Sequence, residues 1–266
     1  MTAQPFLFIT GMHRSGTSLT ANLLCQSGLA LGDDLLEATP DNPDGHFEHR
    51  PFVDFHDAVL GARNANWYEP PSPEVCRWTT SEDETARVLL ADLVGRGGRG
   101  AKDPRATLFL HDWARICPAA HFLLVWRPAS EVCDSLRRRG DPTLHRWVPF
   151  RRQMRALGID RFNARLAAAS WADYNARLAA FAGLMPERCL VLGVRSLTAR
   201  FEELAVALGK RGFELNAAHA EAIVRPDRLQ STPRRGCVRA NRAARNGEIE
   251  DQLAELERAT WERAVP

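Results

Sequence analysis

The sequence is poor in lysine: of its 35 lysine and arginine residues, only Lys102 and Lys210 are lysines. GC-rich coding explains such a bias simply, so the scarcity only marks Lys102, in the stretch Gly-Ala-Lys-Asp-Pro-Arg, for inspection. Neither sign of charge is in clear excess, because the formal net charge is +2. No overall field would attract nucleic acid or a membrane surface, and we expect neither as a partner.

Paired cysteines and long apolar segments are also absent. No Cys-x-x-Cys pair occurs, which argues against zinc, and scattered thiols in apolar patterns predict a reduced, cytoplasmic protein without disulfides. The N-terminus shows no basic stretch followed by a long apolar run, so we expect no signal peptide. The apolar run at residues 6–10 is too short to cross a bilayer, and we expect no stable membrane insertion. The six cysteines are Cys25, Cys76, Cys117, Cys133, Cys189 and Cys237.

The composition that remains is that of an ordinary globular protein, with 45% apolar and 26% charged residues. Three short, apolar, β-prone runs predict buried parallel strands at 6–10, 121–126 and 189–194, and a very short strand is expected within 99–105. Strands that alternate with helices predict a three-layer α/β/α fold around a central parallel sheet. The expected helices cover residues 15–27, 51–66, 81–95, 108–116, 128–138, 163–182 and 197–208, and one more begins near Asn246.

The chain shows no internal repeat and no flexible linker, which favours a single domain over residues 1–266. Within it, the arginine-rich stretch 139–162 is weakly patterned, and we expect a helical insertion that covers one end of the sheet. Two polar segments, 33–50 and 228–245, are predicted to be loops because they are rich in turn-forming residues or in arginine.

The first predicted strand runs into a glycine-rich loop, Gly-Met-His-Arg-Ser-Gly-Thr-Ser, at residues 11–18. Strand, loop and helix together form a P-loop-like anion site, because backbone N–H groups and the positive helix end face the ligand. The glycines have the spacing of nucleotide triphosphatases, but Thr17 occupies the position of their lysine. That lysine bridges the outer phosphates of ATP or GTP, so hydrolysis of either is disfavoured. The cation is instead Arg14, within the loop, which suits a shorter anion.

The stretch Gly-Met-His-Arg-Ser-Gly-Thr-Ser-Leu resembles the 5′-phosphosulfate loop of sulfotransferases that use 3′-phosphoadenosine 5′-phosphosulfate (PAPS). A second segment agrees: the strand at 121–126 ends at Arg127 and Ser135 follows in the next helix, which resembles the 3′-phosphate motif of that family. The resemblance covers roughly residues 5–50 and 98–208 and points to a bacterial member with a P-loop-like fold. It implies transfer of a sulfuryl group from PAPS, with adenosine 3′,5′-bisphosphate (PAP) as product and no metal.

The resemblance also implies which residues hold the nucleotide. Arg14 would lie on the bridging oxygen and the sulfonate, while the loop amides and hydroxyls would hold the 5′-phosphate. Arg127 and Ser135 would hold the 3′-phosphate, for which a bidentate guanidinium is well suited. The stretch 228–245 loosely resembles the late loop that closes over that phosphate, although a solvated basic loop explains it equally well. The nucleotide-binding candidates are His13, Arg14, Ser15, Gly16, Thr17, Ser18, Arg127, Ser135, Arg234, Arg235 and Gly236.

The segment Asn-Pro-Asp-Gly-His-Phe-Glu-His-Arg-Pro-Phe, residues 42–52, resembles the branch of the family in which a glutamate removes the proton of the acceptor. Glu48 is then the expected base, in an unburied position where Arg14 and Lys102 keep it ionised. Lys102 would also place a cation near the sulfonate. Histidine suits proton removal near neutral pH, so histidines are rivals. The catalytic candidates are Glu48, Arg14, Lys102 and His46, with His13 and His49 as further rivals for the base.

Two local patterns allow more than one interpretation. The spacing of His46, Glu48 and His49 suggests a metal, but nothing else in the sequence completes such a site, so we predict none. Asp103 and Arg105 follow a strand end, where active-site residues of open α/β sheets collect. A salt-bridged turn explains these two residues about equally well.

The acceptor is not named by the sequence, and we expect a hydroxyl group of a glycan, a lipid or a small metabolite. We expect the proline-rich segment 66–78, with Trp67, Tyr68 and Trp78, and the stretch 139–162 to line the acceptor entrance. A core role explains Trp67 and Trp78 about equally well. Two other functions compete with sulfuryl transfer: an atypical P-loop nucleotide kinase, and a non-catalytic anion-binding protein. Against the kinase stand the missing loop lysine and the lack of a clear strand-ending aspartate for magnesium.

Overall fold

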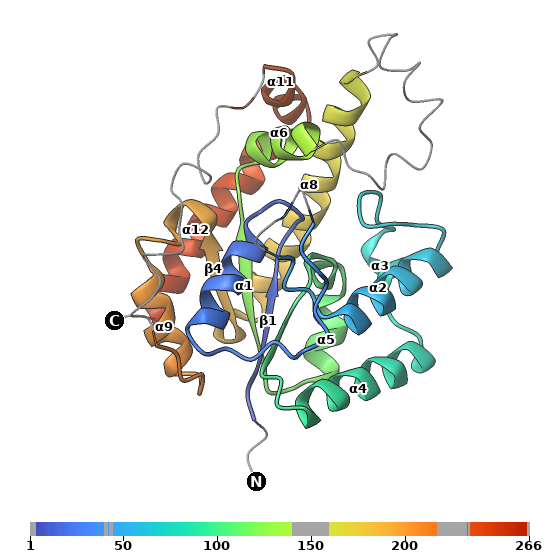
Figure 1. Cartoon of the computed structure of the whole chain (residues 1–266). Coiled ribbons are helices and arrows are strands. Elements are labelled where there is room, and N and C mark those ends of the chain that lie inside the picture. The colour runs from blue at the N-terminus through green and yellow to red at the C-terminus, as the bar shows by residue number, and fades with distance from the viewer. Residues whose placement is uncertain are drawn as a thin grey trace.

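The computed structural model of the protein describes residues 4–39, 42, 45–139, 160–216, 233 and 235–264. Its centre is a four-stranded parallel sheet in the order β2-β1-β3-β4 (Figure 1). The predicted parallel sheet is therefore confirmed, and the very short expected strand is one of its edges. The strands are β1 (Phe6–Thr10), β2 (Gly100–Lys102), β3 (Ala120–Trp126) and β4 (Cys189–Gly193).

Helices cover both faces of the sheet, which confirms the three-layer α/β/α prediction (Figure 1). The described helices are α1 (Thr17–Gln26), α2 (Arg50–Ala62), α3 (Pro73–Cys76), α4 (Thr80–Gly95), α5 (Leu110–Ile116), α6 (Ala129–Arg139), α8 (Asp160–Leu184), α9 (Phe201–Gly209), α11 (Arg235–Ala243) and α12 (Asn246–Ala264). Short 3-10 turns are η1 (Pro104–Phe109), η3 (Pro186–Arg188) and η4 (Val194–Ser196).

Alternation of side chains along the strands explains why both faces of the sheet are apolar. In β1, Phe6 and Phe8 pack into a core shared with α2, α4, α5 and α8, whereas Leu7 and Ile9 pack into a second core with α1 and α9. A strand that is buried on both faces reads as a continuous apolar run. This is why these short strands could be predicted from the sequence.

The predicted helix at 163–182 is α8, and its inner face is the expected one. Trp171, Tyr174, Leu178 and Phe181 are each fully buried. Their three- and four-residue spacing places them on one side of the helix, against the sheet. One of them, Tyr174, lies near the site described below.

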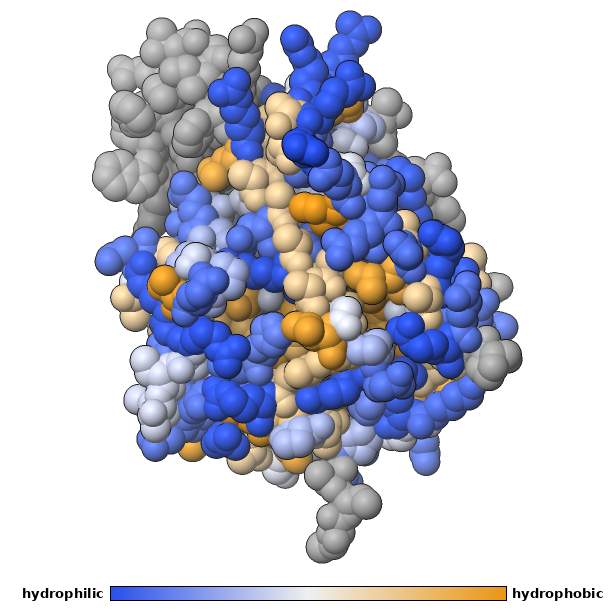
Figure 2. Space-filling view, turned by 180° about the vertical axis from the view of Figure 1, so that it is seen from behind, coloured by the Kyte–Doolittle hydropathy of each residue, from blue (hydrophilic) through white to orange (hydrophobic). Residues whose placement is uncertain are grey.

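The large apolar side chains that stay exposed are spread over several elements of the described chain. In the view from behind, tan residues and small groups of orange ones run down the middle, with blue residues on both sides (Figure 2). Exposed apolar residues that are spread over several elements are normal and give no basis for a docking face. None of the helices in the described ranges is long and apolar enough to span a bilayer. The exposed residues are Val75, Val88, Val94, Leu184, Val206 and Val238.

The predicted loop at 228–245 is wrong in its second half, because a helix, α11, occupies it. α11 packs against α6 and α8, and its Cys237 is buried beside Cys133 and Ala164. The many arginines made the narrow apolar side of this helix hard to recognise in the sequence. That side is buried only because α6 and α8 pack against it. Apart from Pro233, the part before α11 lies outside the described residues.

The predicted helical insertion at 139–162 falls mostly outside the described residues. Its two ends are helical, because α6 runs to Arg139 and α8 begins at Asp160. The prediction for residues 140–159 stays a prediction.

Candidate functional site

Three strand ends meet at one edge of the sheet. Ile9 on β1 pairs with Lys102 on β2, and Thr10 pairs with Leu124 on β3. The hydroxyl of Thr10 also donates to the carbonyl oxygen of Asp103 at 2.8 Å, which ties β1 to the turn after β2. The glycine-rich loop, this turn and the start of α6 therefore gather at one place, as the segments after parallel strands do in open α/β sheets.

The glycine-rich loop passes very close to its neighbours. Gly11 has a φ of 148°, and a Cβ atom there would lie 1.9 Å from the carbonyl oxygen of Val125. Gly16 has a φ of 95°, and a Cβ atom there would lie 2.2 Å from Cγ2 of Val194. Arg14 also has a left-handed φ, 72°, which costs free energy in a residue other than glycine and is frequent at functional sites. The fold thus holds Arg14 in a backbone conformation that residues other than glycine rarely adopt.

The start of α1 supplies backbone donors to this loop. Gly16 precedes the first helical residue, so the amides of Thr17 and Ser18 have no acceptor within the helix. The amide of Ser15 donates instead to the carbonyl oxygen of Met12 at 3.1 Å, and its buried hydroxyl has no hydrogen-bond partner among the described residues. Free amides at the positive end of a helix make a favourable anion site.

The two motifs that resemble phosphate sites touch each other. Nε of Arg14 donates to Oγ of Ser135 at 3.1 Å, although the two residues are 121 positions apart in the chain. Arg127, at the end of β3, is 7% exposed and donates through Nε to Oε2 of Glu131 at 2.8 Å. Glu131 is also paired with Arg195. Arg127 thus places a guanidinium group at the end of β3, and the paired N–H donors of such a group suit a phosphate.

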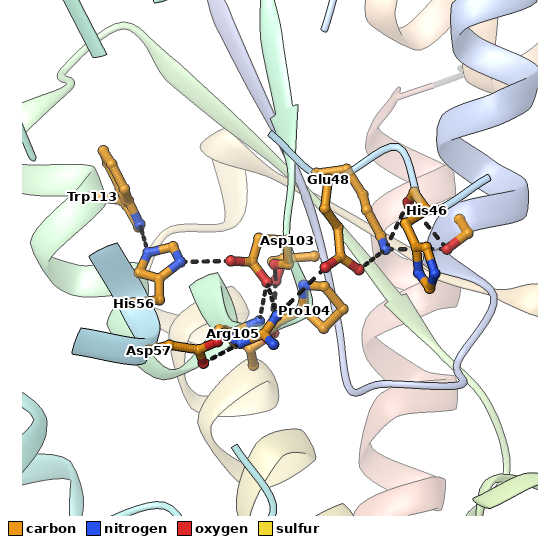
Figure 3. A network of polar contacts seen from close by, with 12 residues as sticks. His46, Glu48, His56, Asp57, Asp103, Pro104, Arg105 and Trp113 are labelled. Carbon is orange, nitrogen blue, oxygen red and sulfur yellow. Dashed lines mark hydrogen bonds and ion pairs between the residues drawn. The ribbon is translucent and has the colours of Figure 1, made fainter. Parts of the chain in front are cut away.

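Lys102 joins three segments of the site through one ammonium group. Its Nζ lies 2.5 Å from Oε1 of Glu48, 3.1 Å from Oγ of Ser18 and 3.1 Å from the carbonyl oxygen of His46 (Figure 3). Lys102 is 1% exposed and Glu48 is 5% exposed. A buried ion pair is tolerated only when further hydrogen bonds satisfy its polar atoms, and Ser18 and His46 supply them here.

The expectation of an unburied Glu48 is wrong. Glu48 forms a parallel β-bridge with Lys102 at the β2 edge of the sheet, and this pairing brings the carboxylate under cover. Its second oxygen, Oε2, lies 3.5 Å from Nη1 of Arg105. The carboxylate is therefore held between two cations, one of which, Arg105, was not expected beside it.

Two of the rival histidines turn their rings to other neighbours. Nε2 of His46 lies 2.9 Å from Oγ1 of Thr39, and it is the backbone carbonyl of His46 that reaches Lys102. His49 is 4% exposed, its ring meets Phe52 edge-on at 5.1 Å, and burial lowers its pKa. Within the described ranges, no group of three or more His, Cys, Asp and Glu side chains is arranged to hold a metal ion.

The third rival, His13, lies inside the site. Its ring is 4.3 Å from the ring of Trp67 and 6.4 Å from that of Tyr174. Burial, together with the nearby charge of Arg105, lowers the pKa of His13 well below its usual value, so the ring is neutral at neutral pH. Its Nε2 is buried without a hydrogen-bond partner in the described part of the chain. A neutral imidazole can accept a proton, so His13 stays a rival to Glu48.

Of the three aromatic residues in the segment 66–78, Trp78 belongs to the core. Trp67 lies against His13, and Tyr68 meets Trp67 edge-on at 5.2 Å. Trp78 is 8% exposed and packs in the core, edge-on to Phe55 at 5.1 Å. The core explanation therefore holds for Trp78, whereas Trp67 lies beside His13 of the glycine-rich loop and Tyr68 lies beside Trp67.

A polar network lies behind Glu48, and three of its members, Asp57, His56 and Trp113, were not predicted from the sequence. Nε of Arg105 lies 2.6 Å from Oδ1 of Asp57, and its Nη1 lies 3.2 Å from Oδ1 of Asp103. Oδ2 of Asp103 lies 2.7 Å from Nδ1 of His56, whose Nε2 lies 3.0 Å from Nε1 of Trp113 (Figure 3). The one available signal was His56, a polar residue on the apolar side of a predicted helix, which needs a partner when buried.

The nucleotide-binding candidates near the C-terminus, Arg234, Arg235 and Gly236, lie only partly within the described residues. Arg235 and Gly236 are exposed residues in the first turn of α11, and Arg234 lies outside the described residues. α11 packs against α6, the helix that carries Ser135. The C-terminal part of the chain therefore approaches the site from the side of α6.

These features define a class of protein, an α/β protein with a parallel sheet and a glycine-rich, arginine-bearing loop after its first strand. The comparison with known families names it: the sequence model described as the sulfotransferase family matches residues 5–208. The chain therefore belongs to the sulfotransferase family, which confirms the resemblance to a sulfotransferase. Membership supports sulfuryl transfer in general. No curated protein matches the chain.

Proposed function

We propose that this protein moves the sulfuryl group of PAPS to a hydroxyl group of a glycan, a lipid or a small metabolite, and releases PAP. The observation that carries the proposal is the hydrogen bond from Arg14 to Ser135. It brings the loop that suits a 5′-phosphate to the helix that suits a 3′-phosphate. A nucleotide with phosphate groups at both positions needs both elements at one site.

The donor is held by backbone and arginine contacts. Amides at the start of α1 and the hydroxyls of Thr17 and Ser18 bind the 5′-phosphate. Arg127 and Ser135 bind the 3′-phosphate, because a guanidinium group offers two parallel donors to phosphate oxygens. Arg14 lies on the bridging oxygen and exchanges its contact with Ser135 for contacts with the donor.

Sulfuryl transfer breaks the bond between sulfur and the bridging phosphate oxygen and forms a bond between sulfur and the acceptor oxygen. Negative charge grows on the departing phosphate, so a cation fixed at that point stabilises the transition state. Arg14 supplies this charge, and Lys102 faces the sulfonate from beside Ser18. The proton of the acceptor hydroxyl passes to Glu48.

The short ion pair between Glu48 and Lys102 competes with that proton transfer. Nζ of Lys102 lies 2.5 Å from Oε1 of Glu48 and 3.1 Å from Oγ of Ser18. A sulfonate beside Ser18 therefore competes for the same ammonium group. As Lys102 turns partly to the sulfonate, Oε1 becomes free to take the proton while the new S–O bond forms.

The acceptor enters past Trp67 and Tyr68 in this proposal. Aromatic rings stack on the faces of sugars and also cover acyl chains, so these residues suit a glycan or a lipid as well as a small metabolite. We further propose one domain over residues 1–266 and a cytoplasmic location. Nucleic acid and membrane insertion have no part in the proposed function.

PAP should bind this protein in the presence of EDTA, because the proposed donor contacts are amides, hydroxyls and arginines rather than a metal. Calorimetry with EDTA measures this directly, and binding that needs magnesium would contradict it. A thermal-shift panel separates the competing functions, since a ligand of the native state raises Tm. PAP should raise Tm for a sulfotransferase, magnesium-ATP for an atypical P-loop kinase, and neither for a non-catalytic anion-binding protein.

Arg127→Ala should weaken the binding of PAP by about 1.5–3 kcal/mol and spare adenosine 5′-phosphate, because a charged contact to the 3′-phosphate is lost. The variant should fold, since Glu131 keeps Arg195 as a counterion. Calorimetry with the two nucleotides gives the comparison, and Ser135→Ala should show the same selectivity with a smaller loss. An equal loss for both nucleotides would place Arg127 away from the 3′-phosphate.

A further inference from the structure

Both carboxylate oxygens of Glu48 are engaged. Oε1 lies 2.5 Å from Nζ of Lys102, and Oε2 lies 3.5 Å from Nη1 of Arg105. A carboxylate held at one oxygen can rotate about its last bond, whereas contacts at both oxygens fix its plane. Arg105 therefore fixes the plane in which the other carboxylate oxygen faces Lys102.

Arg105 is itself held from two sides. Its Nε lies 2.6 Å from Oδ1 of Asp57, and its Nη1 lies 3.2 Å from Oδ1 of Asp103. The backbone N–H of Arg105 donates to that same Oδ1 of Asp103 at 2.9 Å. Because the guanidinium group is a rigid plane, contacts at Nε and Nη1 determine where the whole group lies. Burial alone would lower the pKa of Arg105, but Asp103, Asp57 and Glu48 raise it, so the group stays charged.

Asp103 is oriented in turn by His56, whose tautomer the structure determines. The indole N–H of Trp113 can only donate, and it lies 3.0 Å from Nε2 of His56. Nε2 is therefore an acceptor and Nδ1 carries the proton, which it donates to Oδ2 of Asp103 at 2.7 Å. The side chains of His56 and Asp103 are 0% and 2% exposed, so water does not share these contacts. Burial would raise the pKa of Asp103, but Arg105 and His56 hold it well below its usual range.

We propose that Arg105 is a positioning residue for the proton transfer to Glu48, and that Asp103 and His56 hold Arg105 in place. The inference rests on the proposed function, in which Glu48 takes the proton of the acceptor. When the sulfonate draws Lys102 from Oε1, Arg105 keeps Oε2, so Oε1 continues to face the reacting atoms. A turn with a purely structural role would predict a loss of stability and no specific loss of turnover.

Arg105→Gln should lower turnover at saturating PAPS by about 10–10²-fold, because a displacement of about 1 Å of a catalytic group costs that much. The Kd for PAP and the KM for PAPS should stay close to those of the unmodified protein, since Arg105 is not among the proposed phosphate contacts. Arg105→Lys should recover part of the loss, because it keeps the charge without the planar fork. The measurement is single-turnover formation of PAP from radiolabelled PAPS, with water, sucrose, phenol and dodecanol as acceptor probes.

Arg63→Gln is the matched control. The side chain of Arg63 is 12% exposed, against 11% for Arg105, and it is paired with Glu82 at 2.7 Å. Neither Arg63 nor Glu82 has a proposed part in transfer. This variant should lose stability and keep its turnover. If Arg105→Gln lost no more turnover than Arg63→Gln in samples with equal folded fractions, the inference would be overturned.

Two further measurements separate this inference from the proposed function. Nuclear magnetic resonance of the unmodified protein should show His56 with the proton on Nδ1, and the opposite tautomer would overturn the network whatever the activity. If the protein binds PAP and the Arg105→Gln variant keeps the turnover of the unmodified protein, only the positioning role is refuted. A protein that neither binds PAP nor consumes PAPS refutes the proposed function, and the positioning role with it.

Discussion

Glu48→Gln should lower turnover at saturating PAPS by about 10²–10⁴-fold, because glutamine keeps the size of the side chain but cannot accept the proton of the acceptor. Affinity for PAP should not fall. Lys102 would keep its contacts with Ser18 and His46, at 3.1 Å each, but would lose its counterion. The site would then carry one more positive charge toward an anionic nucleotide. Steady-state kinetics and calorimetry with PAP measure the two effects separately.

Two sets of controls sharpen this test. Glu48→Gln leaves a buried cation unpaired and should lower Tm, whereas the double variant Glu48→Gln with Lys102→Met removes both charges and should recover Tm without recovering turnover. His46→Asn should be mild, because the ring of His46 faces Thr39. If Glu48→Gln stayed active while His46→Asn or His13→Asn were inactive, the base would be a histidine, and the likeness of residues 42–52 to the glutamate branch would be misleading.

Arg14→Ala should damage turnover more than nucleotide affinity. The charge of Arg14 matters most as negative charge grows on the departing phosphate, and loss of one such fixed group costs about 10²–10³-fold in rate. The backbone φ of 72° at this position is about as unfavourable for alanine as for arginine, so the loop should keep its shape. The rate of PAP formation at saturation, set against the Kd for PAP, gives the comparison.

Ser135→Ala is the matched control for Arg14. It removes the hydroxyl that accepts from Nε of Arg14 at 3.1 Å and leaves the guanidinium group in place, so turnover should fall much less. Full turnover of Arg14→Ala at saturating PAPS, with the loss confined to affinity, would show that Arg14 binds the donor and does not act on the transition state.

Strands, loop and fold class could be predicted because their causes are local in the sequence. β1, β3 and β4 are buried on both faces, so each reads as a short apolar run. Gly11 and Gly16 follow the first run at the spacing of an anion loop, and the structure requires glycine at both positions because a Cβ would clash. The family followed from that loop together with Arg127 and Ser135.

The residues that surround Glu48 could not be predicted in the same way, because their ion pairs and hydrogen bonds join residues that are distant in the sequence. Glu48 meets Lys102 across 54 positions and Arg105 across 57, and only the bridge to the β2 edge brings these charges together and buries them. His56 reads locally as one polar residue on an apolar helix side. Its part in holding Asp103 appears only when α2 packs beside the turn after β2.

Local signals therefore determined the sheet, the anion loop and the family, while strand register and helix packing decided the environment of the reacting groups. The same division explains the error at α11, where arginine-rich sequence predicted a loop and contacts with α6 and α8 made a helix. The physical reason is that backbone preferences and apolar periodicity act between near neighbours in the chain. Burial and charge pairing act between neighbours in space, and the tertiary structure alone decides which residues those are.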